Sequence, residues 1–238
     1  MKISVVAPFH NEEGVVKKVV LEILSALRPF GDFEFICVQD GSGDSTGVIL
    51  KSLLADNPEL RVVEIRQSFG YGHAVRKGLE AAKGEIVGYI DGDGQIDFED
   101  IIRVLRLMSS VRAAKAKRVK RRDGWKRAII SRIYNLLTFL LFGFLSSDVN
   151  AKPKFFKRED LEKMKLVSND WFIDAEIMIK AKKLGIKWRE LPIEFKKREE
   201  GFSKVSWRTN LEWLKNLFIW RFGKKLSLWQ KQTIPKQP

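Results

Sequence analysis

Two aspartates stand two positions apart, directly after a strongly apolar run. The run covers residues 86–90, and the segment Asp91-Gly-Asp93-Gly-Gln95 follows it. Carboxylates at positions i and i+2 of a turn can converge on one hard cation such as Mg²⁺ or Mn²⁺, which keeps waters and bridges substrate phosphates. The alternative is a plain turn in which the aspartates bond only backbone N–H groups. The position at the end of a buried strand favours the cation site.

Three further segments carry polar residues, and two of them also carry glycines. Pro8-Phe-His-Asn-Glu12 is a strand-to-helix loop, and Asp40-Gly-Ser-Gly-Asp44 is a tight turn followed by a helix cap. At the end of its strand, Asp40 can also accept a hydrogen bond from a nucleobase N–H. The segment that begins Gly70-Tyr-Gly resembles a phosphate-cradling loop. However, it lacks the lysine of a P-loop and the third glycine of a dinucleotide fingerprint.

Apolar runs with the length of buried strands alternate with helix-period segments over the first hundred residues. We expect strands at 3–7, 33–38, 61–65 and 86–90, and helices at 15–27, 46–55 and 71–82. Later helices are expected at 98–109, 126–145, 171–184 and 209–222, with a late strand at 187–195. The alternation predicts an α/β fold whose mainly parallel sheet is flanked by helices. Ligands of such sheets bind at the carboxyl ends of the strands, which is where the polar segments lie.

The charge of the chain is strongly basic and unevenly spread. The 238 residues carry 44 basic and 30 acidic side chains, a net charge of +14. Residues 112–132 hold ten basic and one acidic side chain, and residues 196–238 hold eleven and three. This excess predicts an anionic partner: phosphate-bearing substrates, anionic lipid or nucleic acid.

The scarcity of cysteine and histidine restricts the metal chemistry. A single cysteine excludes an intrachain disulfide and a cysteine zinc site, and suggests a reducing compartment. Two histidines exclude a histidine-rich site, so a metal would lie on carboxylates. The first residues lack the pattern of a signal peptide, and the longest apolar run, 133–145, is shorter than the roughly 18 residues of a spanning helix. We therefore expect a cytoplasmic protein that does not span a membrane.

In their order along the chain, these motifs resemble the family-2 glycosyltransferases of the GT-A fold. The matching positions are Pro8, Asn11, Glu12, Asp40, Ser42, Asp44, Thr46, Gly70, Gly72, Ala74, Gly78, Asp91, Asp93 and Gln95. The second half narrows the resemblance to dolichyl-phosphate mannosyltransferases, which are polyprenyl-phosphate glycosyltransferases. Its matching positions are Arg118, Arg127, Ser131, Asn135, Asp148, Arg198, Gly201, Ser203 and Lys204.

The resemblance implies a Rossmann-like GT-A domain with C-terminal amphipathic interface helices. This single catalytic domain would cover residues 1–222, with a nucleotide-sugar half at 1–110 and an acceptor half at 111–222. Residues 223–238 would form a basic, flexible tail.

The resemblance also implies a role for each motif. The donor would be bound by Pro8, Asn11, Glu12, Asp40, Gly70, Asp91 and Asp93. A metal ion, Mg²⁺ or Mn²⁺, would lie on Asp91, Asp93 and Gln95. The acceptor phosphate would be bound by Arg118, Arg127, Ser131, Arg198 and Lys204. The catalytic residues would be Asp91, Asp93, Arg127 and Asp174.

The implied reaction is inverting transfer of a sugar from a GDP- or UDP-linked donor to a polyprenyl (dolichyl-type) monophosphate. A phosphate oxygen is already ionised at neutral pH, so no strong general base is required. Arginines suit the task of holding the acceptor phosphate beside the donor diphosphate. The chain departs from the family pattern at Gln39, at Ala151-Lys152-Pro153 and at Glu200, where the family often has aspartate, Ser-Gly-Phe and arginine.

A lipid-linked acceptor stays in the bilayer, so its phosphate must be met at the membrane surface. We expect residues 112–145 and 209–229 to bind anionic bilayers peripherally, at the inner face of a membrane, because both combine aromatic or apolar residues with basic ones. The alternative for 209–229 is that its aromatic residues close the core or a subunit interface.

Two other functions are alternatives to sugar transfer onto a polyprenyl phosphate. The first is a family-2 transferase that glycosylates a saccharide hydroxyl, which would need a base such as Asp174. The second is a non-enzymatic nucleic-acid-binding protein that uses 112–132. That segment has little aromatic interleaving, only Trp125, and no RNA-recognition or zinc signature, so we expect no nucleic-acid partner.

Overall fold

Strands and helices alternate along most of the chain. The computed structural model describes residues 2–121, 125–144, 146–196 and 207–234, and the side chains of these except 120, 121, 125–127, 207 and 208. The strands are β1 (Ile3–Phe9), β2 (Phe33–Asp40), β3 (Leu60–Ile65), β4 (Ile86–Tyr89), β5 (Ala113–Arg121), β6 (Lys154–Lys157) and β7 (Trp188–Phe195). The helices are α1 (Val16–Leu27), α2 (Thr46–Ser52), α3 (Tyr71–Ala81), α4 (Phe98–Arg106), α5 (Trp125–Phe142), α6 (Arg158–Met164), α7 (Ile173–Lys183), α8 (Trp207–Phe222) and α9 (Lys224–Thr233).

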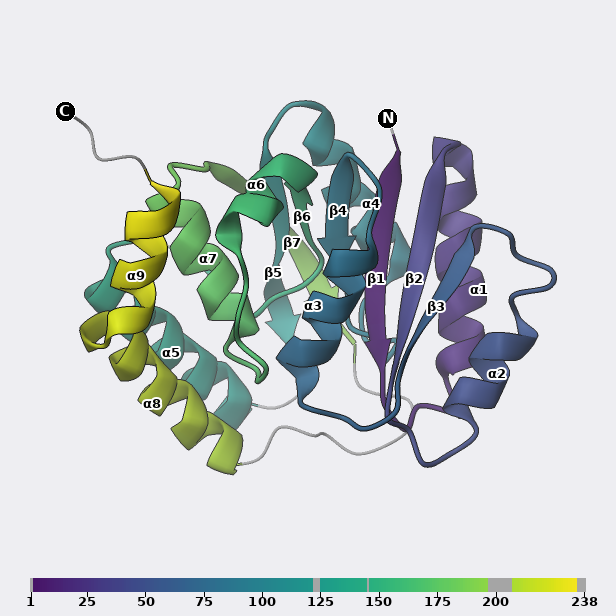
Figure 1. The fold of residues 1–238 in the computed structure, drawn as a ribbon, viewed down its shortest axis with the longest axis horizontal. Helices are drawn as coiled ribbons and strands as arrows, with labels where there is room; N and C mark the ends of the chain where they lie inside the picture. The colour runs from purple at the N-terminus through teal and green to yellow at the C-terminus, as the bar shows by residue number, and fades with distance from the viewer. Residues whose placement is uncertain (1, 122–124, 145, 197–206, 235–238) are drawn as a thin grey trace.

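The described strands form one sheet in the order β3-β2-β1-β4-β6-β5-β7. β1 pairs in parallel with β2 and β4, β2 with β3, and β5 with β7, whereas β6 runs antiparallel to β4 and β5. This confirms the predicted α/β fold with a mainly parallel sheet. Since β1, β2 and β4 run in the same direction, their carboxyl ends share one edge, which faces down in Figure 1. We call it the carboxyl edge.

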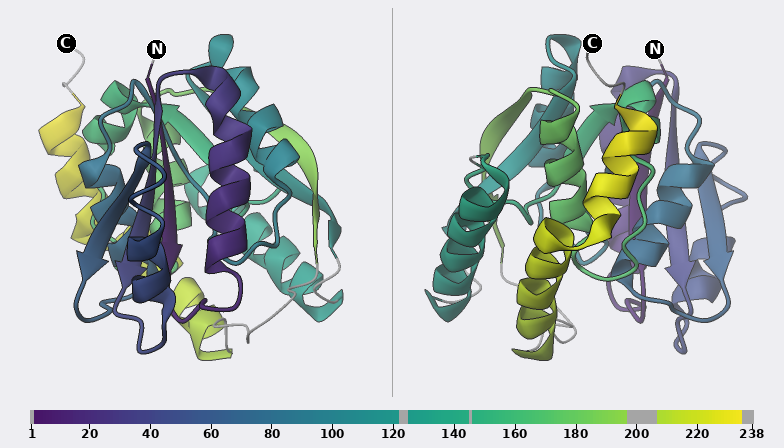
Figure 2. Two further views of the ribbon diagram at one scale, coloured as in Figure 1. Left: turned by 90° about the vertical axis from the view of Figure 1, so that its right-hand side faces the viewer. Right: turned by 60° about the vertical axis from the view of Figure 1, so that its left-hand side comes forward.

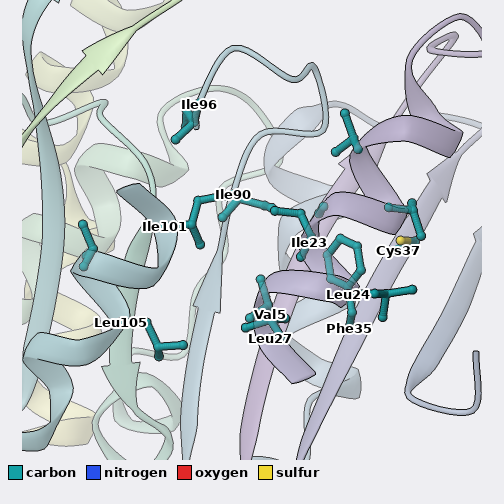
Figure 3. Close-up of a cluster of buried hydrophobic side chains, with 14 of the residues drawn as sticks. Val5, Ile23, Leu24, Leu27, Phe35, Cys37, Ile90, Ile96, Ile101 and Leu105 are labelled. Atoms are coloured by element: carbon teal, nitrogen blue, oxygen red, sulfur yellow. The ribbon is translucent and has the colours of Figure 1, made fainter. Parts of the chain in front are cut away.

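Successive side chains of a strand point to opposite faces of the sheet, and helices pack on both faces. On one face, Val5 and Phe35 belong to one buried cluster with side chains of α1 and α4, among them Leu24 and Leu105, which Figure 3 labels. On the other face, Val6 belongs to one buried cluster with residues of α3, α6 and α7. The continuous apolar runs predicted as strands reflect this burial on both sides.

Four elements were not among those expected from the sequence. β5 lies in the basic segment 112–132, where no strand was predicted, and Lys115 is buried in it. β6 has four residues, two of them lysines, and leads directly into the seven-residue α6. The fourth element is α9, in the predicted tail.

The prediction of a flexible tail over 223–238 was wrong for residues 224–233, which form α9. Leu226 and Trp229 lie three positions apart on one face of this helix and are buried. The Trp229 indole N–H also donates to the backbone oxygen of Lys163 at 3.2 Å. Residues 235–238 lie outside the described residues.

Three helices form one end of the molecule. Figures 1 and 2 show α5, α8 and α9 beyond α7, away from α1 and α2, with α5 and α8 in contact. Both α5 and α8 begin on the side to which the carboxyl edge points (Figure 1). Among the described helices, none combines the length and the apolar character needed to cross a bilayer.

Candidate active site

The loops after β1 and β2 are tied together at the carboxyl edge. Asn11, whose φ is 52°, accepts a hydrogen bond on Oδ1 from the Gly43 N–H at 2.8 Å. The N–H of the buried Glu12 donates to Thr46 Oγ1, also at 2.8 Å. Pro8 lies in β1 next to β2. Asn11 and Glu12 therefore shape the loops of this edge, and donor contacts from these three residues stay predictions.

Asp40 is the last residue of β2, and only one of its two carboxylate oxygens accepts a hydrogen bond from the described part of the chain. Its Oδ2 accepts a hydrogen bond from Ser68 Oγ at 2.8 Å. Its Oδ1 is buried and has no hydrogen-bond partner among the described residues. A buried carboxylate oxygen without a donor is costly, so the site fits a ligand N–H. This geometry is compatible with the predicted nucleobase contact.

Gly70 and Gly72 are explained by packing at the start of α3. A Cβ on Gly70, whose φ is 105°, would lie 2.4 Å from the carbonyl oxygen of Asn169, and one on Gly72 would lie 2.4 Å from that of Asp170. Both glycines let the loop before α7 approach α3 closely. A donor contact from Gly70 stays a prediction.

The three predicted metal ligands all lie in the turn after β4. Asp91 Oδ1 accepts a hydrogen bond from the Tyr71 hydroxyl at 2.9 Å, and Asp93 Oδ1 accepts one from the Gln95 N–H at 3.1 Å. The Gln95 side-chain amide donates to the backbone oxygen of Lys196 at 2.9 Å. Gln95 Oε1 accepts no hydrogen bond from the described residues, so it remains available as a ligand.

This turn is not a complete metal cage. Within the described ranges, no group of three or more His, Cys, Asp or Glu side chains is placed to hold a metal ion. Two carboxylates and an amide oxygen nevertheless fit a hard divalent cation that takes its other ligands from water and substrate phosphates. Burial raises the pKa of Asp91, and Asp93 and Asp174 raise it further against the opposing effect of Lys152. A bound cation would favour the ionised form.

Behind Asp91 lies a buried charge network that we did not predict. Lys152 Nζ lies 3.2 Å from Asp91 Oδ1 and 3.2 Å from Asp174 Oδ2. Asp174 Oδ1 accepts hydrogen bonds from the Tyr89 hydroxyl, at 2.6 Å, and from Lys154 Nζ. The network therefore connects the turn after β4 to the first turn of α7. The only sequence signal was the pair of lysines around Pro153, directly before the apolar Phe155-Phe156.

Asp174, predicted to be a catalytic residue, lies within this network. Its side chain is 2% exposed and is paired with two ammonium groups. Burial raises the pKa of Asp174, but Lys152, Lys154 and the Tyr89 hydroxyl outweigh this and hold it below the ordinary value of 3.8. Such a carboxylate is a weak base, and it holds the two lysines in place. This geometry does not favour the predicted catalytic role.

The structure describes only some of the predicted acceptor-binding side chains. The Arg118 guanidinium forms a two-pronged pair with Asp148, with N–O distances of 2.6 and 2.8 Å, and lies over the Phe195 ring. Ser131 is half-buried on α5. The side chain of Arg127, and all of Arg198 and Lys204, lie outside the described residues. A phosphate site formed by this set stays a prediction.

Comparison with known proteins assigns the family. The model described as "Glycosyl transferase family 2" matches residues 4–165. The chain belongs to this family. The match covers β1 to β4 and extends through α6, so it includes the whole carboxyl edge described above.

Several curated family-2 relatives align with most of the chain. Glycosyltransferase AglD of Haloferax volcanii is 30% identical over 86% of this chain, which spans 34% of that protein's length. Dodecaprenyl-phosphate galacturonate synthase of Rhizobium johnstonii is 27% identical, covering 93% of this chain and 68% of the relative. Dolichyl-phosphate beta-glucosyltransferase of Saccharomyces cerevisiae is 26% identical, covering 96% and 76%.

Solved structures share the fold of this family-2 chain. Glucosyl-3-phosphoglycerate synthase from Mycobacterium tuberculosis, in complex with Mn²⁺, UDP and phosphoglyceric acid, superposes with a TM-score of 0.71. The sequence identity is 20%, and the match covers 91% of this chain and 77% of that one. At this identity the likeness establishes the fold alone.

Proposed function

We propose that this chain transfers a sugar, with inversion, from a nucleotide-sugar donor to a polyprenyl monophosphate at a membrane surface. The observation that carries the proposal is the lipid phosphate in the names of its relatives. The Rhizobium and Saccharomyces proteins, whose names include dodecaprenyl phosphate and dolichyl phosphate, align with 93% and 96% of the chain. Their names specify galacturonate and glucose, so the relatives do not favour mannose over other sugars.

The position of Asp174 supports a phosphate acceptor over a saccharide hydroxyl. A hydroxyl nucleophile needs a general base within hydrogen-bond reach. Asp174, the base considered for that alternative, is buried and paired with Lys152 and Lys154. A phosphate monoester is already ionised near neutral pH and attacks the anomeric carbon without such a base. The binding of nucleic acid has no support from the family assignment.

The carboxyl edge would orient the donor for in-line attack. Asp40 would accept from the base N–H, and the turn after β4 would lie next to the diphosphate. Asp91, Asp93 and Gln95 would hold Mg²⁺ or Mn²⁺, which supplies charge neutralisation of the diphosphate leaving group. Arg118 and the basic residues near the start of α5 would hold the attacking phosphate.

Replacing Asp40 with alanine is expected to weaken nucleotide binding at least about tenfold, because a hydrogen bond to a charged acceptor contributes about 1.5–3 kcal/mol. Calorimetry with UDP and with GDP measures the effect. Asp56→Ala removes an exposed carboxylate near the opposite edge of the sheet and is the matched control. If Asp40→Ala binds the nucleotide as tightly as the wild type does, Asp40 does not contact the base.

The outer faces of α5 and α8 suit contact with a lipid surface. On α5, four exposed apolar residues recur at helical spacing: Ile129, Ile133, Leu136 and Leu140. On α8, the exposed apolar residues are Leu211, Phe218, Ile219 and Phe222. Exposed basic residues accompany them: Arg132, Lys215, Arg221, Lys224 and Lys225. Apolar and basic groups together suit the headgroup region of an anionic bilayer.

The apolar and aromatic residues of 209–229 differ in exposure. Leu217, Trp220 and Trp229 are buried, which favours for them the alternative of closing the core. Phe218 and Phe222 are exposed and stay candidates for lipid contact. Binding at the inner face of the membrane also stays a prediction.

Flotation with liposomes tests this surface. Wild-type protein should float with anionic vesicles and dissociate as salt rises, because exposed charges are screened. Leu136→Glu combined with Leu140→Glu should weaken binding at least about tenfold, since burying one leucine contributes about 1.5–3 kcal/mol. Val48→Glu is the control, because Val48 is 72% exposed on the distant α2. Wild-type protein that stays in the lipid-free fraction at low salt would exclude the membrane surface.

The function itself is tested by a donor screen. Purified chain is incubated with single UDP- and GDP-linked sugars and a short polyprenyl phosphate, with and without Mg²⁺ or Mn²⁺. Mass spectrometry should find one glycosyl-phosphoryl-polyprenol that requires the metal. A complete screen without any such product would count against the proposal.

A further inference from the structure

Lys152 is a buried cation fixed between two carboxylates. Its side chain is 6% exposed, and its Nζ lies 3.2 Å from an oxygen of Asp91 and 3.2 Å from one of Asp174. The ammonium group also lies over the rings of Tyr71 and Trp171, at 5.1 and 5.9 Å from their centroids. These two rings are stacked, with centroids 4.2 Å apart. Lys152 is therefore held from several sides.

The contacts of Tyr71 and Lys152 with Asp91 both involve the same carboxylate oxygen, Oδ1. Oδ1 accepts the hydrogen bond from the Tyr71 hydroxyl at 2.9 Å and is the oxygen closest to Lys152. Oδ2 accepts no hydrogen bond from the described residues, and the side chain keeps 18% exposure. Asp91 thus presents a single oxygen for a ligand.

We propose that Lys152, together with Tyr71, restricts Asp91 to one-oxygen coordination and so makes the turn after β4 selective for small octahedral cations over Ca²⁺. This rests on the proposed function, in which Asp91 is a metal ligand. Mg²⁺ demands near-octahedral geometry, whereas Ca²⁺ takes six to eight oxygens and readily uses both oxygens of a carboxylate. With Oδ1 occupied by Tyr71 and Lys152, the two-oxygen mode that Ca²⁺ favours is blocked. Lys152 is a positioning residue, because it acts through Asp91.

The test is a competition for Mn²⁺ in the presence of the nucleotide, UDP or GDP, that binds the wild type. Electron paramagnetic resonance of unbound Mn²⁺ gives the apparent affinities of Mg²⁺ and Ca²⁺ as competitors. Lys152→Met keeps the length of the side chain and removes its charge, and Asp174 remains paired with Lys154. The ratio of Ca²⁺ to Mg²⁺ affinity should rise about tenfold, the size of effect seen for groups that orient metal ligands.

Two further variants make the result specific. Lys154→Met removes a lysine that contacts Asp174 and Tyr89 but not Asp91, so it should leave the ratio unchanged. Tyr71→Phe removes the other contact to Oδ1 and should raise the ratio, even if Lys152→Met does not fold. An unchanged ratio in Lys152→Met and Tyr71→Phe, or an equal rise in Lys154→Met, would overturn the inference. Failure of the wild type to bind Mn²⁺ with nucleotide would instead remove the proposed metal site, and the inference with it.

Discussion

Sugar transfer is expected to fall at least about 100-fold when Asp93 is replaced by alanine, with the fold intact. Asp93 lies in the turn after β4, beyond the last residue of the strand, where a side chain contributes little to the core. Its proposed task is to hold the cation that would stabilise the leaving diphosphate. Initial rates at saturating Mn²⁺, with a thermal melt for each protein, measure the effect.

The control for this variant is Asp56→Ala, which removes an exposed aspartate from a turn away from the carboxyl edge. It should keep the wild-type rate. If Asp93→Ala retained more than half of the wild-type activity at saturating Mn²⁺, Asp93 would not be a metal ligand.

Replacing Asp174 with asparagine is expected to lower the free energy of unfolding by about 3–5 kcal/mol, because it leaves buried lysines without their counter-charge. Burial lowers the pKa of Lys154 from 10.5 to about 7, against the opposing attraction of Asp174. Without Asp174 this pKa falls further, and the added cost is greatest below about pH 7, where the wild-type lysine is protonated. The loss of stability should therefore shrink as the pH rises through that value.

Urea unfolding at about pH 6 and about pH 9 checks both parts of this prediction. Glu80→Gln is the control, because Glu80 pairs with Lys77 on the surface and such pairs contribute little. A loss below about 1 kcal/mol, or one that grows with pH, would show that Asp174 does not hold the buried lysines.

The first half of the fold was predictable because its strands are buried on both faces. Val5 and Val6 pack into opposite cores, so β1 is a continuous apolar run bounded by a polar loop. The polar residues that follow β1, β2 and β4 then had to meet at one edge. The sequence alone located Asp40, Asp91 and Asp93 there.

The second half was less predictable because its buried positions include charged side chains. Lys115, Lys152 and Lys154 are buried, yet a single sequence does not distinguish them from lysines on a solvated surface. Their partners, such as Asp174, are distant in sequence and meet them only in the folded chain. The same limit applies to α8, where buried Trp220 and exposed Phe222 are two positions apart.

An acceptor comparison tests most directly whether the acceptor is a lipid-linked phosphate, as we propose. With the donor found in the screen and the metal held constant, the chain is offered a short polyprenyl phosphate, the matching polyprenol without phosphate, and a saccharide. We expect a glycosyl-phosphoryl-polyprenol from the first acceptor and no product from the other two. Transfer to the saccharide hydroxyl with none to the phosphate would contradict the proposal.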